Sequence, residues 1–327
     1  MPQSRPAVIA ALLASLPPSS FAQQPPGKPP VLPEVVVSAT RVEEESFDLP
    51  VSIDRVDRAV IREDKPQVNL SESLGRVPGI VVQNRQNYAQ DLQISSRGFG
   101  SRSTFGVRGL RLIADGIPAT MPDGQGQAAT FSLGSADRIE VMRGPFSSLY
   151  GNAAGGVIQI FTADGPREPT ASGSLYAGSY DTWKLGAQYG GTRGPLNYLI
   201  DASRFRTGGY RDHSEARRDH VNAKLKHDTG GRGVLTVVVN SLEQPETRDP
   251  LGLTAAQVAQ NRRQAGANAL AFDTRKSIVQ TQLGFTYGLP VTASDRLEAR
   301  AYFGDRQVTQ HLGIPLFVQT ATPTHSG

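Results

Sequence analysis

The second half of this sequence alternates apolar and polar residues with a period of two. In the segment 279–287, Val279, Leu283 and Phe285 stand on one side of an extended chain, and Gln280 and Gln282 stand on the other. The same alternation runs through the segments 183–189, 221–226 and 296–303. Because successive side chains of a β-strand point to opposite faces, these segments are predicted to be strands with one apolar and one polar face.

Two architectures use such strands, a soluble β-sandwich and a transmembrane β-barrel. No apolar run approaches the roughly 18 residues that a membrane-spanning helix needs. Alternation alone does not separate the two architectures, but an export signal and aromatic residues near the strand ends favour the barrel. We expect about seven or eight strands between Ser172 and Thr309, with a long polar loop at Gln244–Phe272. The aromatic residues are Tyr176, Tyr180, Trp183 and Tyr189.

The export signal stands at the N-terminus. Met1–Pro6 carries one Arg, Ala7–Leu16 is an apolar run, and Ser20-Phe21-Ala22 has the small-x-small pattern of a cleavage site. We therefore expect residues 1–22 to be a signal peptide and the mature chain to begin near Gln23.

A proline-rich spacer follows the signal. Residues 23–33 contain five prolines, which favour extended polyproline II and make the segment semi-rigid. The β-branched stretch Val35–Val37 comes directly after it and is free of proline. A tethered stretch of this kind can add a strand to the exposed sheet edge of a partner protein. It can equally be the first strand of the domain that follows, and the residues alone leave both readings open.

Residues 45–165 have the pattern of one compact α+β domain. Leu70, Leu74 and Val77 form a single stripe of a short helix, which Pro78-Gly79 ends. Short strands with Gly and Pro between them are predicted after the helix. They are Ile80–Val82, Gln93–Ser96, Arg111–Ala114, Ile139–Met142 and Val157–Thr162.

Composition and motifs exclude several kinds of chemistry. The chain has no Cys, so disulfides and thiolate metal sites are excluded, and its net charge of +4 does not indicate nucleic acid. No nucleophile-elbow, zinc-protease or phosphate-loop motif occurs, so we expect no catalytic residue, no cofactor and no enzymatic activity. His213, His220 and His227 are spaced by seven, which alternates faces on a strand, so no shared metal site is expected.

Four motifs, in this order, resemble the plug domain of the TonB-dependent outer-membrane receptors. They are NLSESLGRVPGIVV ending at Val82, ISSRGF at Ile94–Phe99, LRLIADGIP at Leu110–Pro118, and RIEVMRGPFSSLYGNAAGGVIQIFT at Arg138–Thr162. The resemblance covers roughly residues 34–165 closely and the strands to about 310 loosely. A narrower resemblance, over Asn84–Gln127 and Asp273–Gln282, is to the subgroup that includes the pyrroloquinoline quinone receptor.

The resemblance implies a fold, a location and a function. The fold would be an α+β plug domain followed by antiparallel transmembrane β-barrel strands, in the outer membrane of a Gram-negative bacterium. Receptors of this family close a barrel of 22 strands, and only 162 residues follow Gly165 (327 minus 165). We therefore expect residues 170–327 to be the N-terminal part of an incomplete barrel. The implied function is energy-coupled uptake of a scarce small molecule.

The resemblance also identifies residues 34–41 as the TonB box, the strand that pairs with the C-terminal domain of TonB. The residues assigned to the box are Glu34, Val35, Val36, Val37, Ser38, Ala39 and Thr40.

A basic segment of the plug is the predicted ligand surface. From Arg85 to Arg111 there are five Arg and one acid, Asp91, a local charge of +4. Guanidinium groups bind carboxylates bidentately, and interspersed aromatic rings can stack on a flat ligand, which suits a quinone tricarboxylate or an anionic iron chelate. Each Arg can instead hold the plug by pairing with a barrel acid, a role that fits Arg97 and Arg143 better. The candidate ligand residues are Tyr88, Arg102, Arg108, Asp123, Gln125 and Gln127.

Two classes of function remain, a transport receptor and a non-transporting surface protein that only binds. The TonB box separates them, because a passive binder has no use for an energy-coupling strand. The expected partners are TonB with its inner-membrane energising complex, a small anionic ligand and outer-membrane lipid, with no nucleic acid. Neither the identity of the ligand nor the oligomeric state follows from the residues.

Overall fold

The structure is a computed structural model that divides the chain into two compact units, 1–34 and 35–327. Side chains are described for residues 52–84, 86–103, 106–121, 123–144, 146, 149–151, 153–292 and 295–314, and the backbone alone for 36–37, 44–45 and 147–148. The predicted signal peptide, the spacer and all of the box except Val36–Val37 lie outside the described residues. Every described helix and strand belongs to the second unit.

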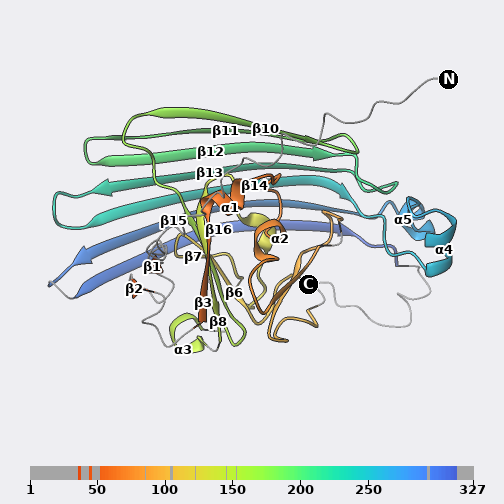
Figure 1. Ribbon diagram of the computed structural model, residues 1–327, viewed down its shortest axis with the longest axis horizontal. Helices are drawn as coiled ribbons and strands as arrows, with labels where there is room; N and C mark the ends of the chain where they lie inside the picture. Colours follow the sequence, from red (N-terminus) through yellow and green to blue (C-terminus); the bar gives the residue numbers. More distant parts are fainter. Residues whose placement is uncertain are drawn as a thin grey trace, which may run out of the picture. The chain divides into compact units, whose positions relative to one another are not determined.

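Seven antiparallel strands form one sheet, and each pairs with the next strand along the chain (Figure 1). Their number confirms the expectation of seven or eight strands. The strands lengthen from 9 residues in the first to 16 residues in the last two. They are β10 (Thr170–Gly178), β11 (Thr182–Arg193), β12 (Leu196–Thr207), β13 (Ala216–Asp228), β14 (Val234–Arg248), β15 (Arg275–Pro290) and β16 (Arg296–His311).

The connections differ in length at the two ends of this sheet. At one end, residues 194–195 and 229–233 make short turns, and only five residues separate β15 from β16. At the other end, the loop 249–274 carries α4 (Ala255–Gln260) and α5 (Ala267–Ala271), which Figure 1 shows beyond the strand ends. The predicted start of this loop at Gln244 is wrong. Residues 244–248 still pair with β15 across a bulge, so the strand runs on to Arg248.

The two faces of the sheet have the reverse of the polarity found in a soluble sheet. On β13, Arg218, Asn222 and Lys224 are buried, whereas Val221 and Leu225 are 42% and 37% exposed. The strand β15 repeats this pattern. A soluble sandwich buries its apolar face, so the sandwich is excluded, and a polar inner face with an apolar outer face is the arrangement of a transmembrane barrel. The seven strands are therefore an arc of such a barrel.

Residues 52–162 form the α+β body that the sequence predicts. A mixed five-stranded sheet has the order β3-β8-β9-β6-β7, in which β6 runs parallel to β9 and the other neighbours are antiparallel. A separate hairpin joins β4 and β5. The strands are β3 (Ser52–Asp57), β4 (Ile80–Gln83), β5 (Gln93–Ser96), β6 (Arg111–Ala114), β7 (Ile117–Pro118), β8 (Ala136–Arg143) and β9 (Gly156–Thr162). The helices are α1 (Arg58–Arg62), α2 (Ser71–Leu74), the 3-10 helix η1 (Ala128–Thr130) and α3 (Ser147–Tyr150).

The five strands predicted from the sequence are all present, and the helix is present in shortened form. The stripe Leu70, Leu74 and Val77 is buried in the core as predicted, with at most 4% exposure. The helix itself spans only Ser71–Leu74, because the chain turns toward β4 at Pro78-Gly79, where Gly79 has a φ of +76°. Among the described residues, no helix is long and apolar enough to cross a membrane.

A third, very small element lies N-terminal to this body. Val36–Val37 (β1) pairs antiparallel with Glu44–Glu45 (β2), and this two-residue ladder belongs to neither larger sheet.

The reversed polarity predicts the effect of a charge on the outer face. Leu283 lies near the middle of β15 and pairs with Val239 and Phe303. Leu283→Arg in the full-length protein should destabilise the membrane-inserted state by about 2–4 kcal/mol, because a guanidinium at the bilayer midplane is poorly solvated. Denaturant titration in lipid vesicles measures this cost, with Leu283→Met as the matched control. Equal stability of the two variants would mean that this face does not meet lipid.

Candidate functional site

Two loops of the plug are tied together at the end of the five-stranded sheet. Val107 and Gly126 exchange two backbone hydrogen bonds, of 2.9 and 2.7 Å. Gly106 is required beside this contact, because its φ is +61° and a Cβ there would lie 2.7 Å from the carbonyl oxygen of Gly126. The Gly124 N–H also donates to the Met121 carbonyl at 2.9 Å. The side chains that these loops carry are therefore held on a fixed backbone.

A cavity of about 690 Å³ and one of about 620 Å³ are the two roomy cavities described, and the second lies against these loops. We call the second one the plug–barrel cavity, because plug loops and the strands β15 and β16 both line it. Its plug residues are Asp91, Arg102, Ser103, Arg108, Met121, Gln125 and Gln127, and its barrel residues are Lys276, Arg306, Val308 and Gln310.

The structure brings most of the predicted ligand residues to this cavity. Arg102, Arg108, Gln125 and Gln127 line it. Asp123 lies beside them, since its Oδ2 accepts a 3.0 Å bond from Arg108 Nη2. The hydrogen bond from the Gln125 backbone N–H and the charge of Arg108 hold the pKa of Asp123 below its ordinary value, against a weaker opposing effect of desolvation.

Tyr88, the sixth predicted residue, does not line the cavity. Its ring packs on Phe205 of β12 at 4.9 Å between centroids, and the guanidinium of Arg218 lies 6.0 Å from the ring centre. Burial raises the pKa of Tyr88 to about 12, with Arg218 acting in the opposite direction. The described residues that line the cavity include no aromatic side chain, so the expected stacking of aromatic rings on a flat ligand stays a prediction.

Sequence reasoning missed the barrel side of the cavity. Lys276 pairs in register with Gln310, and Gln280 pairs with Arg306, so all four stand on the inward face of two adjacent strands. The period-two pattern indicates which residues face inward, but it does not indicate which plug loop they meet.

The charges of the cavity are only partly paired. Lys276 Nζ lies 2.9 Å from Asp91 Oδ1, and Arg108 is paired with Asp123. Within the described ranges, no ion pair engages Arg102 or Arg306. Among the described residues, the cavity therefore carries two guanidiniums without an ion pair of their own, although Asp91 also attracts Arg306 through space.

The described arginines of the segment 85–111 meet no acid of the seven-stranded arc. Of those described (Arg97, Arg102, Arg108 and Arg111), none forms an ion pair with a strand of the arc. Arg143 does have the expected structural role, but within the plug, where it donates to the Pro78 carbonyl at 2.7 Å and pairs with Asp54. The barrel supplies cations instead, and Lys276 meeting Asp91 is one example.

At the turn 67–69, too, the cations come from the barrel and the acceptors from the plug. We call this set of contacts the clasp. The carboxylate of Glu72 accepts the backbone N–H groups of residues 67, 68 and 69 at 2.6 to 2.9 Å. From the barrel, Lys184 donates to the Gln67 carbonyl at 2.8 Å and Arg218 donates to the Val68 carbonyl at 2.7 Å. Burial raises the pKa of Glu72 even though these three N–H groups favour its charged form.

A third set of contacts fixes the junction between the plug and the arc. Lys224 Nζ lies 2.8 Å from Asp164 Oδ1, and Lys226 Nζ lies 2.7 Å from Asp164 Oδ2. Lys224 also donates to the Thr162 carbonyl at the end of β9. Burial would raise the pKa of Asp164, but the two lysines outweigh it and hold that pKa below its ordinary value.

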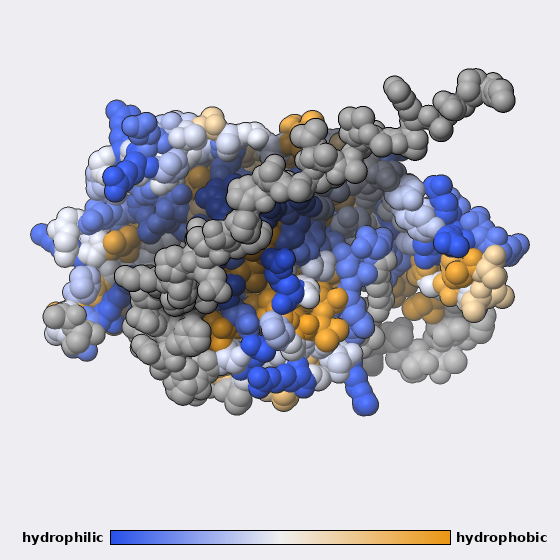
Figure 2. Space-filling view, viewed as in Figure 1, coloured by the Kyte–Doolittle hydropathy of each residue, from blue (hydrophilic) through white to orange (hydrophobic). Residues whose placement is uncertain are grey.

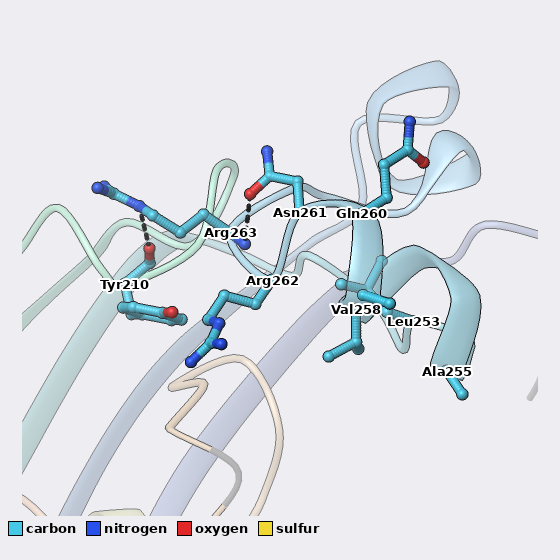
Figure 3. A pocket seen from close by; sticks show the side chains of 9 residues that line it. Tyr210, Leu253, Ala255, Val258, Gln260, Asn261, Arg262 and Arg263 are labelled. Carbon is cyan, nitrogen blue, oxygen red and sulfur yellow. Dashed lines mark hydrogen bonds between the residues drawn. The ribbon is translucent and has the colours of Figure 1, made fainter.

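The larger cavity lies in the outer loop 249–274 and is a less suitable ligand site. Figure 3 shows Arg263 already engaged, with its Nε donating to the Tyr210 carbonyl at 3.1 Å. The same guanidinium lies 5.5 Å from the ring centre of Tyr180 and 5.8 Å from that of Tyr210. Leu253, Ala255 and Val258 make much of the remaining lining. Figure 2 shows a hydrophobic patch near α4 with hydrophilic residues beside it.

No group of three or more His, Asp or Glu side chains that could hold a metal ion occurs in the part of the chain that the structure describes.

Comparison with known proteins decides the family of the plug. The TonB-dependent Receptor Plug Domain family matches residues 45–157. Residues 45–157, about a third of the chain, therefore match a TonB-dependent receptor plug domain. Receptors of this family are located in the outer membrane of Gram-negative bacteria, and so is this chain. They are transporters and receptors rather than enzymes.

Relatives by sequence carry different ligands in their names. The vitamin B12 transporter BtuB of Vibrio vulnificus (strain CMCP6) is 30% identical over 146 residues, which cover 44% of this chain and 23% of the transporter. The ferric enterobactin receptor of Pseudomonas aeruginosa is 30% identical over 161 residues, which cover 45% of this chain and 20% of the receptor. The matched part therefore spans about a quarter or less of these relatives.

Solved structures agree on the fold. The ferric citrate transporter FecA in its unliganded form superposes with a TM-score of 0.67 at 21% identity, covering 81% of this chain and 41% of that one. The ferric yersiniabactin uptake receptor FyuA from Yersinia pestis gives 0.60 at 21% identity, covering 80% and 41%. The plug followed by antiparallel barrel strands is thus confirmed as the fold. The narrower resemblance to the pyrroloquinoline quinone subgroup has no counterpart among these relatives.

The junction at Asp164 yields a pH-dependent prediction. Asp164→Asn in the full-length protein should raise hydrogen exchange of the 162–165 amides about fivefold at pH 7, equivalent to about 1 kcal/mol for a partly exposed ion pair. Because the folded-state pKa of Asp164 is lowered, its stabilisation is present above the ordinary value of about 3.9 and is lost as the pH falls through the lower folded value. The difference between variant and wild type should therefore shrink below about pH 4, after correction for intrinsic exchange.

Glu168→Gln is the matched control, because Glu168 is an exposed acid of the same linker that accepts only through its backbone carbonyl. A difference between wild type and Asp164→Asn that stays constant down to pH 3 would contradict the role of the charge.

Proposed function

We propose that the receptor to which this chain belongs takes up a small anionic ligand across the outer membrane with energy supplied through TonB. The observation that carries the proposal is the plug–barrel cavity with its unpaired Arg102 and Arg306. A guanidinium presents a planar fork of donors that suits carboxylates and related anions. Pyrroloquinoline quinone and an anionic ferric siderophore both have this chemistry. A corrinoid without carboxylates, such as cyanocobalamin, does not.

The candidate contacts on the plug are Arg102, Arg108, Gln125 and Gln127, with Asp123 orienting Arg108. A cavity bounded by both plug and barrel supports a role in transport. A ligand held there touches the plug, which must move during transport, and the barrel, which stays in place.

The TonB box is the proposed coupling element. The β-branched segment Glu34–Thr40 would add a strand to the C-terminal domain of TonB, an interaction that depends on main-chain hydrogen bonds. The pairing of Val36–Val37 with Glu44–Glu45 supports this proposal, because it shows that these residues take extended, ladder-forming backbone outside the five-stranded sheet of the plug. If the segment were the first strand of the plug, it would pair with β3 or β7 at the sheet edges.

The remaining partner is the lipid of the outer membrane, which the apolar outer face of the arc would contact. No feature of the described surface calls for nucleic acid, and no arrangement of the described side chains calls for catalysis. The competing function is a surface protein that binds a ligand and does not transport it. It would bind equally well without the box.

A proline in the box separates the two functions. Val36→Pro removes a backbone donor and fixes φ, so strand addition to TonB should fail and energised uptake should fall to the level of a strain without TonB. Ligand binding by whole cells should remain unchanged, because the cavity is remote in sequence from the box. Uptake of labelled pyrroloquinoline quinone and of a labelled ferric siderophore measures both quantities in the full-length receptor.

Val36→Thr is the control, since it keeps a β-branched residue and the backbone N–H. Full uptake by the proline variant would refute the assignment of the box, and uptake that is independent of TonB in every variant would refute the transport function.

A further inference from the structure

We infer that Arg102 of the plug and Arg306 of β16 form a carboxylate clamp that takes two separate carboxylates of one ligand. The receptor would therefore select molecules with at least two carboxylates over those with one or none. This inference rests on the proposed function, and it names the class of ligand that the plug–barrel cavity accepts.

Arg306 is held in place with hydrogen-bonding capacity left over. It stands on the inward face of β16 opposite Gln280, and its Nη1 donates to the Gln280 Oε1 at 3.3 Å. Its Nη2 is buried and finds no hydrogen-bond partner in the described structure. A buried charged donor without a partner loses its hydration with no compensation, at a free-energy cost that an incoming acceptor removes. The unsatisfied nitrogen belongs to a residue that lines the cavity.

Arg102 complements it from a loop whose backbone is fixed. The Ser101 hydroxyl donates to the Gly98 carbonyl at 2.8 Å, and the Ser103 hydroxyl donates to the Gly106 carbonyl at 2.8 Å. Gln93 Nε2 donates to the Ser101 carbonyl at 3.1 Å. These bonds fix the loop on both sides of Arg102, while the side chain of Arg102 is exposed and no described acid pairs with it. The backbone is thus preorganised and the guanidinium is available.

The other two cations of the cavity do not share this task. Only 7% of the Lys276 side chain is exposed and its ammonium is paired with Asp91, and Arg108 is paired with Asp123. The lining cations number four and the acids beside them number two, which leaves a net charge of +2 (4 minus 2). A single carboxylate carries one negative charge, so it would leave one of these two positive charges uncompensated, whereas two carboxylates would match both guanidiniums.

Gln127 adds a neutral contact. Its side chain is 6% exposed, and its Oε1 is buried without a partner among the described residues. Because an amide can be turned to present either oxygen or nitrogen, this group can accept from or donate to a ligand held between the two arginines. Three polar groups with unused capacity, from two plug loops and one strand, therefore converge on one cavity.

A ligand held in this way would connect the plug to the barrel. One carboxylate would be bound to the loop 98–103 and the other to β16. The bound ligand would therefore contact the plug and the barrel at the same time. A ligand with one carboxylate would bind one arm and would make no such link.

The test uses the purified full-length receptor and pyrroloquinoline quinone, which has three carboxylates, beside its trimethyl ester, which keeps the rings and has no carboxylate. Wild type should bind the acid at least about 100-fold more tightly than the ester, since two charge-assisted contacts are lost. Arg102→Gln and Arg306→Gln should each weaken binding of the acid about 10-fold or more and should leave binding of the ester unchanged. Arg306→Lys should lie between, because lysine keeps the charge and lacks the fork.

Arg204→Gln is the matched control, since Arg204 is an exposed arginine of β12 that pairs with Asp219 and does not line the cavity. Its affinity should equal that of wild type. If Arg306→Gln fails to assemble, the affinities of the wild-type receptor for the acid and for the ester still test the clamp. A ratio of these two affinities near one overturns the clamp. Unchanged affinity in both glutamine variants also overturns it.

Ferric citrate and cyanocobalamin separate the clamp from the transport function. The clamp is overturned if the receptor binds cyanocobalamin but neither carboxylate probe, or if it binds no probe at all. Uptake that depends on the box would still support transport in both cases. Binding that depends on both arginines without any uptake that depends on the box supports the clamp and refutes the proposed function.

Discussion

The structure depends on the direction in which the strands of the arc present their polar side chains. Polar groups on β11, β13 and β15 point toward the plug and apolar groups point away from it, so the plug must supply partners for lysines and arginines taken out of water. It does so with backbone carbonyls at Gln67 and Val68 and with carboxylates at Asp91 and Asp164. At these positions the plug and the arc are therefore matched by charge and hydrogen bonding, beside apolar contacts such as Tyr88 on Phe205.

This matching explains which parts of the fold were predictable. Period-two alternation is a local property, so the strands of the arc and their two faces follow from the sequence. The plug strands follow from short apolar runs bounded by Gly and Pro. The end of β14 does not, because Gln244 and Thr247 read as loop residues while a bulge keeps them paired with β15. The shortening of the helix at Leu74 likewise depends on where the chain must turn.

The residues of the ligand site also divide into those that local sequence predicts and those that depend on distant contacts. Arg102, Arg108, Gln125 and Gln127 are close in sequence and lie on loops that two hydrogen bonds between Val107 and Gly126 hold together, so local reasoning finds them. Arg306 is about 200 residues away and reaches the cavity only through the register of β15 with β16. Tyr88 illustrates the opposite case. Polar neighbours in sequence suggest an exposed ring, and Phe205 from a distant strand covers it.

The clasp around residues 67–69 has a consequence for how the two bodies can separate. The N–H groups of this turn are bound by Glu72 of the plug itself, whereas its carbonyls are bound by Lys184 and Arg218 of the barrel. If the barrel contact is withdrawn, the turn keeps its internal support and presents only acceptors, which water solvates readily. Water molecules can thus replace Lys184 and Arg218 one after the other at these carbonyls. The segment 67–69 would keep its fold while the plug and the barrel separate.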